Sequence, residues 1–335
     1  MYNIKNSNQI QIIDTIFGIN TPEQFRDAAL AIFNYQVAEN EVYRDFVSGM
    51  KIKPSGIAEL EDIPFLPIEF FKTHKVITNA VDKKRKVQFF TSSGVIQSRH
   101  YVKHLAIYER SYKQGFEYFY GNIKDYCILA LLPSYMERGG SSLVYMVNDL
   151  IRYTEHPSSG FYLHNYDELI FKLKELEQQK QKTILLGVTY ALLNLIEEKK
   201  IQLNHTIIME TGGMKGKRKE MVREELHSVL CKGFGVNVIH SEYGMTELLS
   251  QAYSKGNGMF YCPPWMKLLI RDTNDPLSIL KENKTGGINI IDLANINSCS
   301  FIATQDLGKT YSDTSFEILG RFDNSDLRGC NLLLE

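Results

Sequence analysis

The hydrophobic pattern of the chain changes near residue 126. From there on, short and continuously apolar runs alternate with longer amphipathic segments. The apolar runs predict buried strands at 127–132, 183–188, 206–210 and 236–240. Continuous apolar strands separated by amphipathic helices are typical of a parallel sheet that is covered on both faces. The pattern therefore predicts an α/β fold built on a mainly parallel sheet.

Two of the amphipathic segments show the helical spacing clearly. In residues 167–179, one face carries Leu169, Leu173 and Leu176. In residues 218–233, the side chains expected to point inward are Val222, Leu226, Val229 and Leu230. Gly233 is expected to end this helix, since glycine readily adopts the left-handed conformation that follows many helices.

The N-terminal part of the chain predicts helices and irregular segments. A helix is expected from Pro22 onward, with Thr21 as its N-cap and Gln24 three positions further. Its inward face is expected to carry Phe25, Ala29, Ile32 and Phe33. Residues 63–77 contain two prolines and predict an extended segment rather than a helix.

The pattern changes again after residue 285. Segments at 286–293, 298–308 and 312–322 alternate like antiparallel strands joined by glycine-containing turns. We therefore predict two domains. Residues 1–284 form an α/β core with a helical N-terminal segment, and residues 285–335 form a small antiparallel β subdomain.

The composition is that of an ordinary globular protein. The 335 residues are 44% hydrophobic and 23% charged, with 38 basic and 39 acidic side chains. This balance argues against nucleic acid or an anionic membrane as a partner. No apolar run reaches the ~18 residues of a membrane helix, and the N-terminus lacks the pattern of a secretory signal. The five cysteines show no CxxC spacing, which disfavours a disulfide framework or zinc site and favours a cytoplasmic location.

Polar and glycine-rich stretches follow each of the predicted parallel strands. They are residues 133–140, 189–190, 211–216 and 241–247. Parallel sheets bind ligands beyond the carboxyl ends of their strands, so these stretches would share one edge. In the last stretch, Tyr243 offers a flat face for a base, Thr246 a hydroxyl for a phosphate and Glu247 a carboxylate for Mg²⁺. A turn with Thr246 as the N-cap of a following helix is the alternative.

Residues 89–102, FFTSSGVIQSRHYV, contain a run of small polar residues: Thr91, Ser92, Ser93 and Gly94. Such a run can present hydroxyl and backbone N–H groups to one anion, although by itself it is also an ordinary turn. Asp306 is placed as a ribose acceptor would be, or is a turn aspartate. Residues 320–331 cluster charges that a surface ion-pair loop would also explain: Arg321, Asp323, Asp326 and Arg328.

Taken in this order, the stretches resemble the adenylate-forming superfamily of acyl and aryl ligases. Its phosphate loop, YGxTE segment, ribose aspartate and GRxD hinge correspond to TSSG (91–94), YGMTE (243–247), Asp306 and GRFD (320–323). The similarity is closer to the LuxE-like acyl-protein synthetases, which share IPFLPIEFFK, SRHYV, ETGGMKG, YGMTELLSQAY and GRFDNSDLRGCNLL. It extends from about residue 30 to residue 335.

The resemblance implies a reaction in two steps. A carboxylic acid, expected to be a long-chain fatty acid, attacks the α-phosphate of ATP and gives an acyl-adenylate and pyrophosphate. Cys330 then takes the acyl group as a thioester, for delivery to an acyl-CoA or fatty acid reductase or to another acyl-accepting protein. By composition alone Cys330 is a buried cysteine, whereas the resemblance makes it the acceptor, with Arg328 nearby to stabilise its thiolate.

The resemblance also implies ATP and Mg²⁺ as cofactors and assigns roles to individual residues. The catalytic residues would be Cys330, Arg328 and Arg99, and the metal ligand would be Glu247. Tyr135 and His240 would contact the substrate, although His240 is also explained as a satisfied buried histidine. The nucleotide contacts would be Thr91, Ser92, Ser93, Gly94, Ser98, Gly212, Gly213, Tyr243, Gly244, Met245, Thr246, Glu247, Asp306 and Arg321.

Two departures from the superfamily leave alternatives open. The usual second glycine and the lysine of the phosphate loop are absent, because Val95 and Ile96 follow Gly94 and stiffen the backbone. This pair favours a non-catalytic acyl- or nucleotide-binding scaffold subunit. The C-terminal lid domain is also expected to be absent, which disfavours a third possibility, a coenzyme A ligase-like enzyme with a different acceptor.

Overall fold

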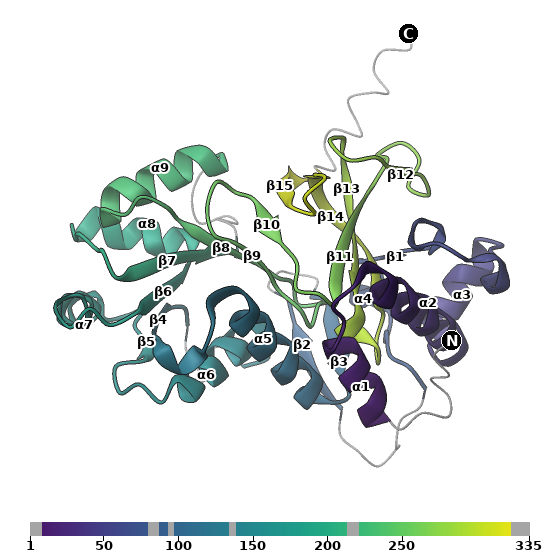
Figure 1. The fold of residues 1–335 in the computed structure, drawn as a ribbon, viewed down its shortest axis with the longest axis horizontal. Helices are drawn as coiled ribbons and strands as arrows, with labels where there is room; N and C mark the ends of the chain where they lie inside the picture. Colours follow the sequence, from purple (N-terminus) through teal and green to yellow (C-terminus); the bar gives the residue numbers. More distant parts are fainter. Residues whose placement is uncertain (1–8, 80–86, 93–96, 134–138, 213–220, 323–335) are drawn as a thin grey trace, which may run out of the picture. The chain divides into compact units, whose positions relative to one another are not determined.

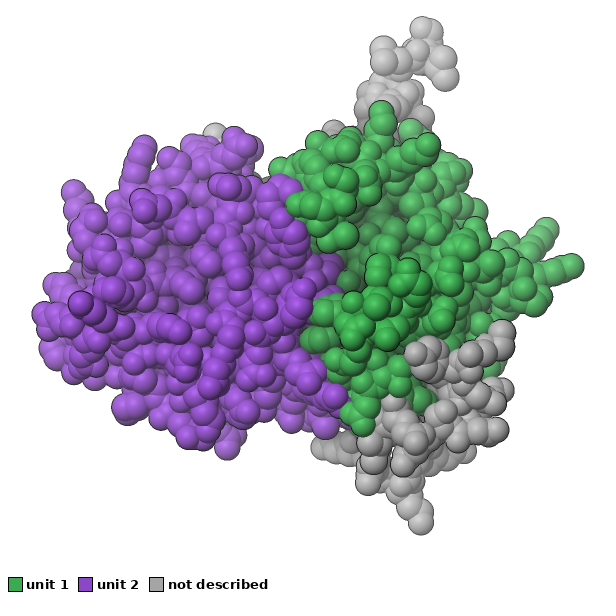
Figure 2. Space-filling view, in the orientation of Figure 1, with its two compact units in different colours: residues 1–88, 100–103, 264–335 green, residues 89–99, 104–263 purple. Residues whose placement is uncertain are grey.

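The computed structural model describes residues 9–79, 87–92, 97–133, 139–212 and 221–322. The chain divides into two compact units that are interleaved in sequence (Figure 2). Unit 1 comprises residues 1–88, 100–103 and 264–335, and unit 2 comprises residues 89–99 and 104–263. The predicted domain boundary at residue 284 falls inside unit 1. That boundary stays a prediction, and the two units are described separately below.

Unit 2 contains the predicted parallel sheet. Its strands are β4 (Cys127–Leu131), β5 (Gly160–Phe161), β6 (Thr183–Val188), β7 (Thr206–Thr211), β8 (His240–Tyr243), β9 (Ala252–Ser254) and β10 (Phe260–Tyr261). They lie in the order β10-β9-β8-β7-β6-β4-β5 (Figure 1). The strands from β5 to β8 are parallel, whereas β9 and β10 continue the sheet antiparallel. The predicted fold class is thus confirmed for this unit.

Three of the four predicted parallel strands are confirmed, but the fourth is displaced. It was expected at residues 236–240, and instead β8 begins at His240. The pairing with β7 starts at Met209 opposite His240, so the preceding apolar residues have no strand beside them. Among those residues, Val238 is exposed. As a result, Glu242 and Tyr243 belong to the strand and not to the loop after it.

Helices cover both faces of this sheet. They are α5 (Leu105–Tyr120), α6 (Ser142–Thr154), α7 (Tyr166–Gln178), α8 (Thr189–Glu198) and α9 (Arg223–Phe234), with a short 3₁₀ turn, η3, at Ile123–Asp125. Leucines of α7, α8 and α9 share one buried cluster with Leu129, Leu185 and Ile208 of the sheet. Helices α5 and α6 lie on the opposite side (Figure 1). Among the described residues, no helix is both long and apolar enough to cross a membrane.

The prediction for α9 is only partly correct. Leu226 and Leu230 are buried as expected, but Val222 precedes the helix with 71% of its surface exposed, and Val229 is also exposed. The helix ends at Gly235, which has φ 68°, and not at Gly233. The expectation for Val222, Val229 and Gly233 was wrong, because helical spacing does not reveal where the neighbouring layer stops.

Unit 1 combines N-terminal helices with an antiparallel sheet. Its helices are α1 (Gln9–Phe17), α2 (Pro22–Glu39), α3 (Glu41–Gly49) and α4 (Phe70–Thr73), with 3₁₀ turns η1 (Pro54–Gly56), η2 (Leu60–Asp62) and η4 (Leu293–Asn295). Its strands are β1 (Leu66–Pro67), β11 (Met266–Arg271), β12 (Ile279–Leu280), β13 (Thr285–Asp292), β14 (Phe301–Thr310) and β15 (Phe316–Arg321). The order is β12-β11-β13-β14-β15, all antiparallel, and β1 pairs parallel with β14.

The expectations for the N-terminal segment are mostly confirmed. Thr21 caps α2 by accepting a hydrogen bond from the backbone N–H of Gln24, and the predicted inward residues are buried. Residues 63–77 are extended at β1, but Phe70–Thr73 form one helical turn. The expectation of a fully extended segment was wrong for that turn, because both prolines precede it and remove none of its hydrogen bonds.

Buried amides attach α2 to the sheet of unit 1. Gln36 Nε2 donates to the carbonyl oxygens of Asn295 and Ile296, each at 3.0 Å, and Gln36 Oε1 accepts from Ser300 N at 2.9 Å. Asn40 Nδ2 donates to Ser298 O at 2.9 Å. Because buried polar groups are costly unless they are paired, these bonds define where the helix sits on the connection between β13 and β14.

Replacing Gly233 by alanine tests the packing of α9 on α8. Alanine in place of a helical glycine usually stabilises by about 0.5–1 kcal/mol. Here the new Cβ would lie 2.6 Å from Cβ of Ile196. Overpacking costs about 1–3 kcal/mol, so we expect a lower urea midpoint. Gly49→Ala is the matched control, because no atom lies within 4 Å of its Cβ. Equal behaviour of the two variants would contradict the packing described.

Candidate functional site

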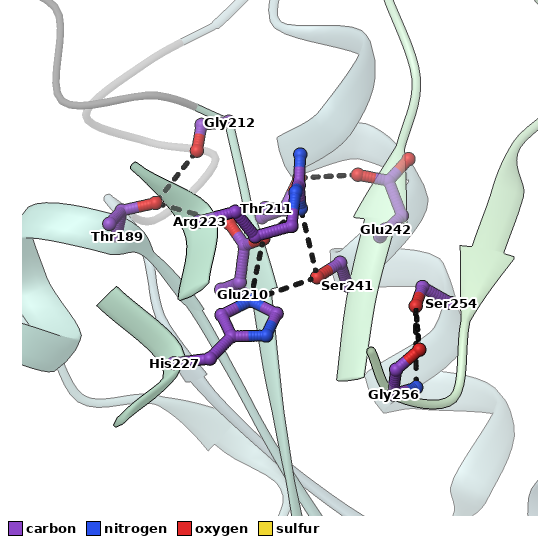
Figure 3. A network of polar contacts seen from close by, with 10 residues as sticks. All are labelled: Thr189, Glu210, Thr211, Gly212, Arg223, His227, Ser241, Glu242, Ser254 and Gly256. Carbon is purple, nitrogen blue, oxygen red and sulfur yellow. Dashed lines mark hydrogen bonds and ion pairs between the residues drawn. The ribbon is translucent and has the colours of Figure 1, made fainter. Parts of the chain in front are cut away.

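Two glutamates lie at the carboxyl ends of adjacent parallel strands in unit 2. Glu210 is the penultimate residue of β7 and pairs with Ser241, and Thr211 pairs with Glu242 of β8. Paired residues on parallel strands point to the same face. Glu210 and Ser241 therefore point toward α9, while Thr211 and Glu242 point to the other side (Figure 3).

Side chains of two helices contact the carboxylate of Glu210. From α9, Arg223 Nη1 donates to Glu210 Oε1 at 2.9 Å, and His227 Nε2 lies 3.6 Å from the same oxygen. From α8, Thr189 Oγ1 donates to Glu210 Oε2 at 3.1 Å. Burial raises the pKa of Glu210, but His227, Arg223 and Ser241 outweigh that effect and hold the pKa below its usual value.

The same network reaches the turn after β7. The hydroxyl of Thr189 also lies 2.8 Å from the carbonyl oxygen of Gly212, and its single proton is shared between this oxygen and Glu210 Oε2. Gly212 has φ 70°, a left-handed conformation that glycine adopts without strain. Predicted nucleotide contact Gly212 is thereby attached to α8 and to Glu210 through one side chain.

Arg223 also connects the network to the predicted base-binding residue. Its guanidinium lies over the ring of Phe260, 5.0 Å from the centroid. The Phe260 ring in turn packs edge-on against Tyr243, with 6.2 Å between centroids. A cation over an aromatic face is favourable, more so when both are removed from water. The ion pair of Glu210 therefore supports the orientation of the Tyr243 ring.

Glu242 differs electrostatically from Glu210. Thr211 Oγ1 donates a hydrogen bond to its Oε2. Burial, and to a smaller extent the charge of Glu210, raises the pKa of Glu242 to about 7 against the lowering effect of Thr211. Tyr253 of β9 is the cross-strand partner of Glu242, and burial together with Glu242 raises the pKa of Tyr253 and of Tyr108 in α5. Glu242 is therefore a proton-binding group inside the sheet edge.

The YGMTE segment leaves the sheet in a tight turn. Tyr243 is the last residue of β8 and is buried. Leu248 N donates to Met245 O at 3.1 Å, which closes a turn that contains Thr246 and Glu247. The chain then continues into β9, so the alternative with Thr246 as a helix N-cap is wrong. Thr246 is half-buried and Glu247 is buried.

The described ends of the hydroxyl loop are held together. The loop follows β2 (Gln88–Thr91) and precedes β3 (Arg99–Val102). Ser92 N donates to Ser98 O at 3.2 Å, and Ser98 N donates to Ser92 Oγ at 2.9 Å. Thr91 N donates to Gly140 O at 2.8 Å, which attaches the loop to the segment after β4. Predicted contacts Ser92 and Ser98 are thus brought together.

Unit 1 carries a second pair of predicted contacts. Asp306 of β14 and Arg321 of β15 are cross-strand partners, and Arg321 Nε donates to Asp306 Oδ1 at 2.9 Å. Asp306 is buried, whereas about half of the Arg321 side chain is exposed. The predicted ribose acceptor and the arginine of GRFD are therefore brought together, which the sequence had not indicated.

Of the remaining predicted residues, the structure describes Arg99 and His240, and the others lie outside the described residues. Arg99 is an exposed residue at the start of β3. His240 is half-buried, its Nδ1 lies 3.1 Å from the hydroxyl of Tyr120, and burial together with Lys255 lowers its pKa to about 4. Several predicted residues lie outside the part of the chain that the structure describes: Ser93, Gly94, Val95, Ile96, Tyr135, Gly213, Asp323, Asp326, Arg328 and Cys330.

A magnesium site would rest on Glu247 together with a bound phosphate. Within the described ranges, no three His, Cys, Asp or Glu side chains gather to hold a metal ion by themselves. Mg²⁺ is usually bound by one or two carboxylates, with water and substrate phosphates completing its coordination. A single buried carboxylate, on the residue that follows Thr246, fits that pattern.

Sequence reasoning missed the residues that support the site. Glu210, Arg223, His227 and Glu242 were not among the predicted site residues. The signal for Glu210 was a single acidic residue at the end of the apolar strand run TIIMET, whereas the polar run HSEY gave no such signal for Glu242. A charge at such a position is rarely buried without a partner, and this should have pointed to a polar network.

Comparisons with known proteins agree with this geometry. The model of the family "Acyl-protein synthetase, LuxE" matches residues 15–335. Among solved structures, an open conformation of 2-hydroxyisobutyryl-CoA ligase in complex with 2-HIB-AMP and CoA aligns with TM-score 0.67 and 14% identity, over 91% of this chain and 72% of that chain. ATP-bound MatB from Rhodopseudomonas palustris aligns with TM-score 0.52 and 15% identity, over 73% of this chain and 50% of that chain.

These likenesses establish the fold, which is that of the N-terminal domain of adenylate-forming enzymes. The chain spans about half the length of the first solved structures it matches, at 47% and 50% of theirs. No curated protein matches the chain.

Replacing Glu242 by glutamine tests its protonation. A pKa raised from 4.5 to about 7 means that the folded state binds this proton more tightly than the unfolded state. The free energy of unfolding should therefore fall as the pH rises through this range, by an amount on the order of 3 kcal/mol. Glu242→Gln should lack this fall in urea unfolding at pH 5 and pH 8.

Glu210→Gln is the matched control for that experiment. The pKa of Glu210 is lowered, so its stabilisation is present at neutral pH and is lost as the pH falls. Glu210→Gln should therefore be destabilised most at neutral pH. An identical pH dependence in Glu242→Gln and the unmodified protein would show that Glu242 does not hold the proton.

Proposed function

The chain belongs to the LuxE family of acyl-protein synthetases, and from this membership we propose that it uses ATP to transfer an acyl group to Cys330. In the first step a carboxylate oxygen of a long-chain fatty acid attacks the α-phosphorus of ATP. An acyl-adenylate forms, and pyrophosphate leaves. In the second step the Cys330 thiolate attacks the acyl carbon, a thioester forms, and AMP leaves with the bonding electrons.

One structural observation carries the first step. Three of the predicted nucleotide-binding segments follow parallel strands of unit 2: Gly140, which holds Thr91, follows β4; Gly212 follows β7; and residues 244–247 follow β8. The carboxyl ends of these strands face one edge of the sheet, which is where such sheets bind ligands. This arrangement supports the proposal that the hydroxyls, backbone N–H groups and aromatic face required by a nucleotide meet at that edge.

Each residue has a distinct role in this proposal. Thr91 and Thr246 donate hydrogen bonds to phosphate oxygens, and Tyr243 packs against the adenine. Glu247 would hold Mg²⁺, which would neutralise charge on the phosphates. Phosphoryl transfer depends mainly on such positioning and charge neutralisation. Asp306 would accept hydrogen bonds from the ribose hydroxyls, with Arg321 beside it.

The second step rests on the sequence of the last residues. Arg328 lies two positions before Cys330 and favours the thiolate, which is the reactive form of cysteine. The acyl-adenylate is a mixed anhydride, so a thiolate can displace AMP without further activation. The thioester would then be delivered to an acyl-accepting protein such as a reductase. A scaffold without catalysis is the alternative, which the Val95 and Ile96 pair favours.

Intact-mass analysis with ATP, Mg²⁺ and a panel of carboxylic acids tests the proposal. We expect a mass gain of one acyl unit that hydroxylamine removes, together with pyrophosphate release. Cys330→Ser should still release pyrophosphate but show no mass gain, because only the second step needs the thiol. An acyl-AMP product without any protein adduct would move the acceptor to another molecule. Absence of both products would favour the scaffold.

A further inference from the structure

Gly244 of the YGMTE segment lies between Tyr243, the last residue of β8, and the turn formed by Met245–Leu248. Its backbone φ lies outside the left-handed region, so its conformation by itself does not require glycine. A Cβ added there would lie 2.5 Å from Glu242 Oε1 and 3.4 Å from Gln251 Cγ. The need for glycine at this position therefore comes from the carboxyl group of Glu242.

That carboxyl group is not free to move aside. Its other oxygen, Oε2, accepts the hydrogen bond from Thr211 Oγ1 on the neighbouring strand (Figure 3). The Glu242 side chain is buried, and Tyr253 of the neighbouring strand β9 is its cross-strand partner. Turning the carboxyl away from Gly244 would break the hydrogen bond with Thr211 and leave a buried donor unpaired, which is costly.

We propose that Glu242 is a positioning residue: anchored by Thr211, it directs the chain through Gly244 into the turn that presents Thr246 and Glu247. Through this contact the end of β7 and the turn after β8 are held in one arrangement. The inference rests on the proposed function, in which that turn binds the phosphates of ATP. It adds a residue that touches neither substrate nor metal and acts through the backbone of its neighbour.

A double-mutant cycle tests this role. Gly244→Ala should raise the KM for ATP by about tenfold, since the new methyl group displaces the turn, and should leave the KM for the carboxylic acid unchanged. Glu242→Ala removes the opposing oxygen and should raise the KM for ATP only about threefold. The double variant should resemble Glu242→Ala, because the methyl group then has room. A KM equal to the product of the two single effects would overturn the proposal.

Gly212→Ala is the matched control at the same sheet edge. Its Cβ would meet no atom within 4 Å, and its cost comes from the φ of 70°. Glu242→Ala should therefore not relieve it, and the two effects should multiply. Relief of Gly212→Ala as large as that of Gly244→Ala would mean that Glu242→Ala acts by general loosening, which also overturns the proposal.

The same cycle measured by urea unfolding separates this inference from the proposed function. Glu242→Ala, which itself loses the hydrogen bond with Thr211, should abolish the further fall in urea midpoint that Gly244→Ala causes, so the double variant should match Glu242→Ala alone, whether or not the protein turns over ATP. If the unmodified protein does not turn over ATP, the proposed function fails, and the dissociation constant of a non-hydrolysable ATP analogue replaces KM in the cycle. If the double variant matches Glu242→Ala in urea unfolding but the ATP affinity is the same in all variants, the positioning role is overturned.

Discussion

The burial of two carboxyl groups, on opposite faces of adjacent strands at the end of the parallel sheet, is the constraint on which the architecture of unit 2 depends. Taking a charge out of water costs several kcal/mol unless it is paired or neutralised. Glu210 meets this cost through its ion pair with Arg223, and Glu242 meets it by holding a proton and a hydrogen bond from Thr211. Each solution requires partners from other elements, so the edge can be assembled in few ways.

The constraint extends from the glutamates to the residues proposed to bind nucleotide. Arg223, the partner of Glu210, lies over the ring of Phe260, which packs against Tyr243. Thr189, which contacts Glu210, also contacts the carbonyl oxygen of Gly212. The hydroxyl loop has a separate support. Phe90, which precedes it, is fully buried and packs against the rings of both Tyr108 and Tyr145, with 5.5 Å between centroids in each case. A preorganised edge lowers the cost of ordering these groups when a ligand binds.

Unit 1 also contains a buried charged group, the guanidinium of Arg271, which is paired by hydrogen bonds. Arg271 donates from Nη1 to Ile288 O at 2.7 Å and to Asn289 Oδ1 at 2.9 Å, and from Nη2 to Thr304 O. These bonds occupy the irregular part of the β13–β14 pairing, just before Asp306. Hydrogen bonds from Arg271 therefore hold β14 next to the proposed ribose contact Asp306, and Asp306 itself pairs with Arg321.

Periodicity, capping and proline placement act over a few residues, so the sequence alone determined β4, β6, β7, the N-cap at Thr21 and the family of the chain. The start of β8 and the end of α9 were missed, because each depends on which neighbouring element is present to pair or pack. The contacts between Glu210 and Arg223, between Glu242 and Thr211, and between Asp306 and Arg321 were decided only by the tertiary structure. A buried charge is tolerated only where the fold places a partner beside it, and a local sequence pattern does not predict which distant residue that partner is.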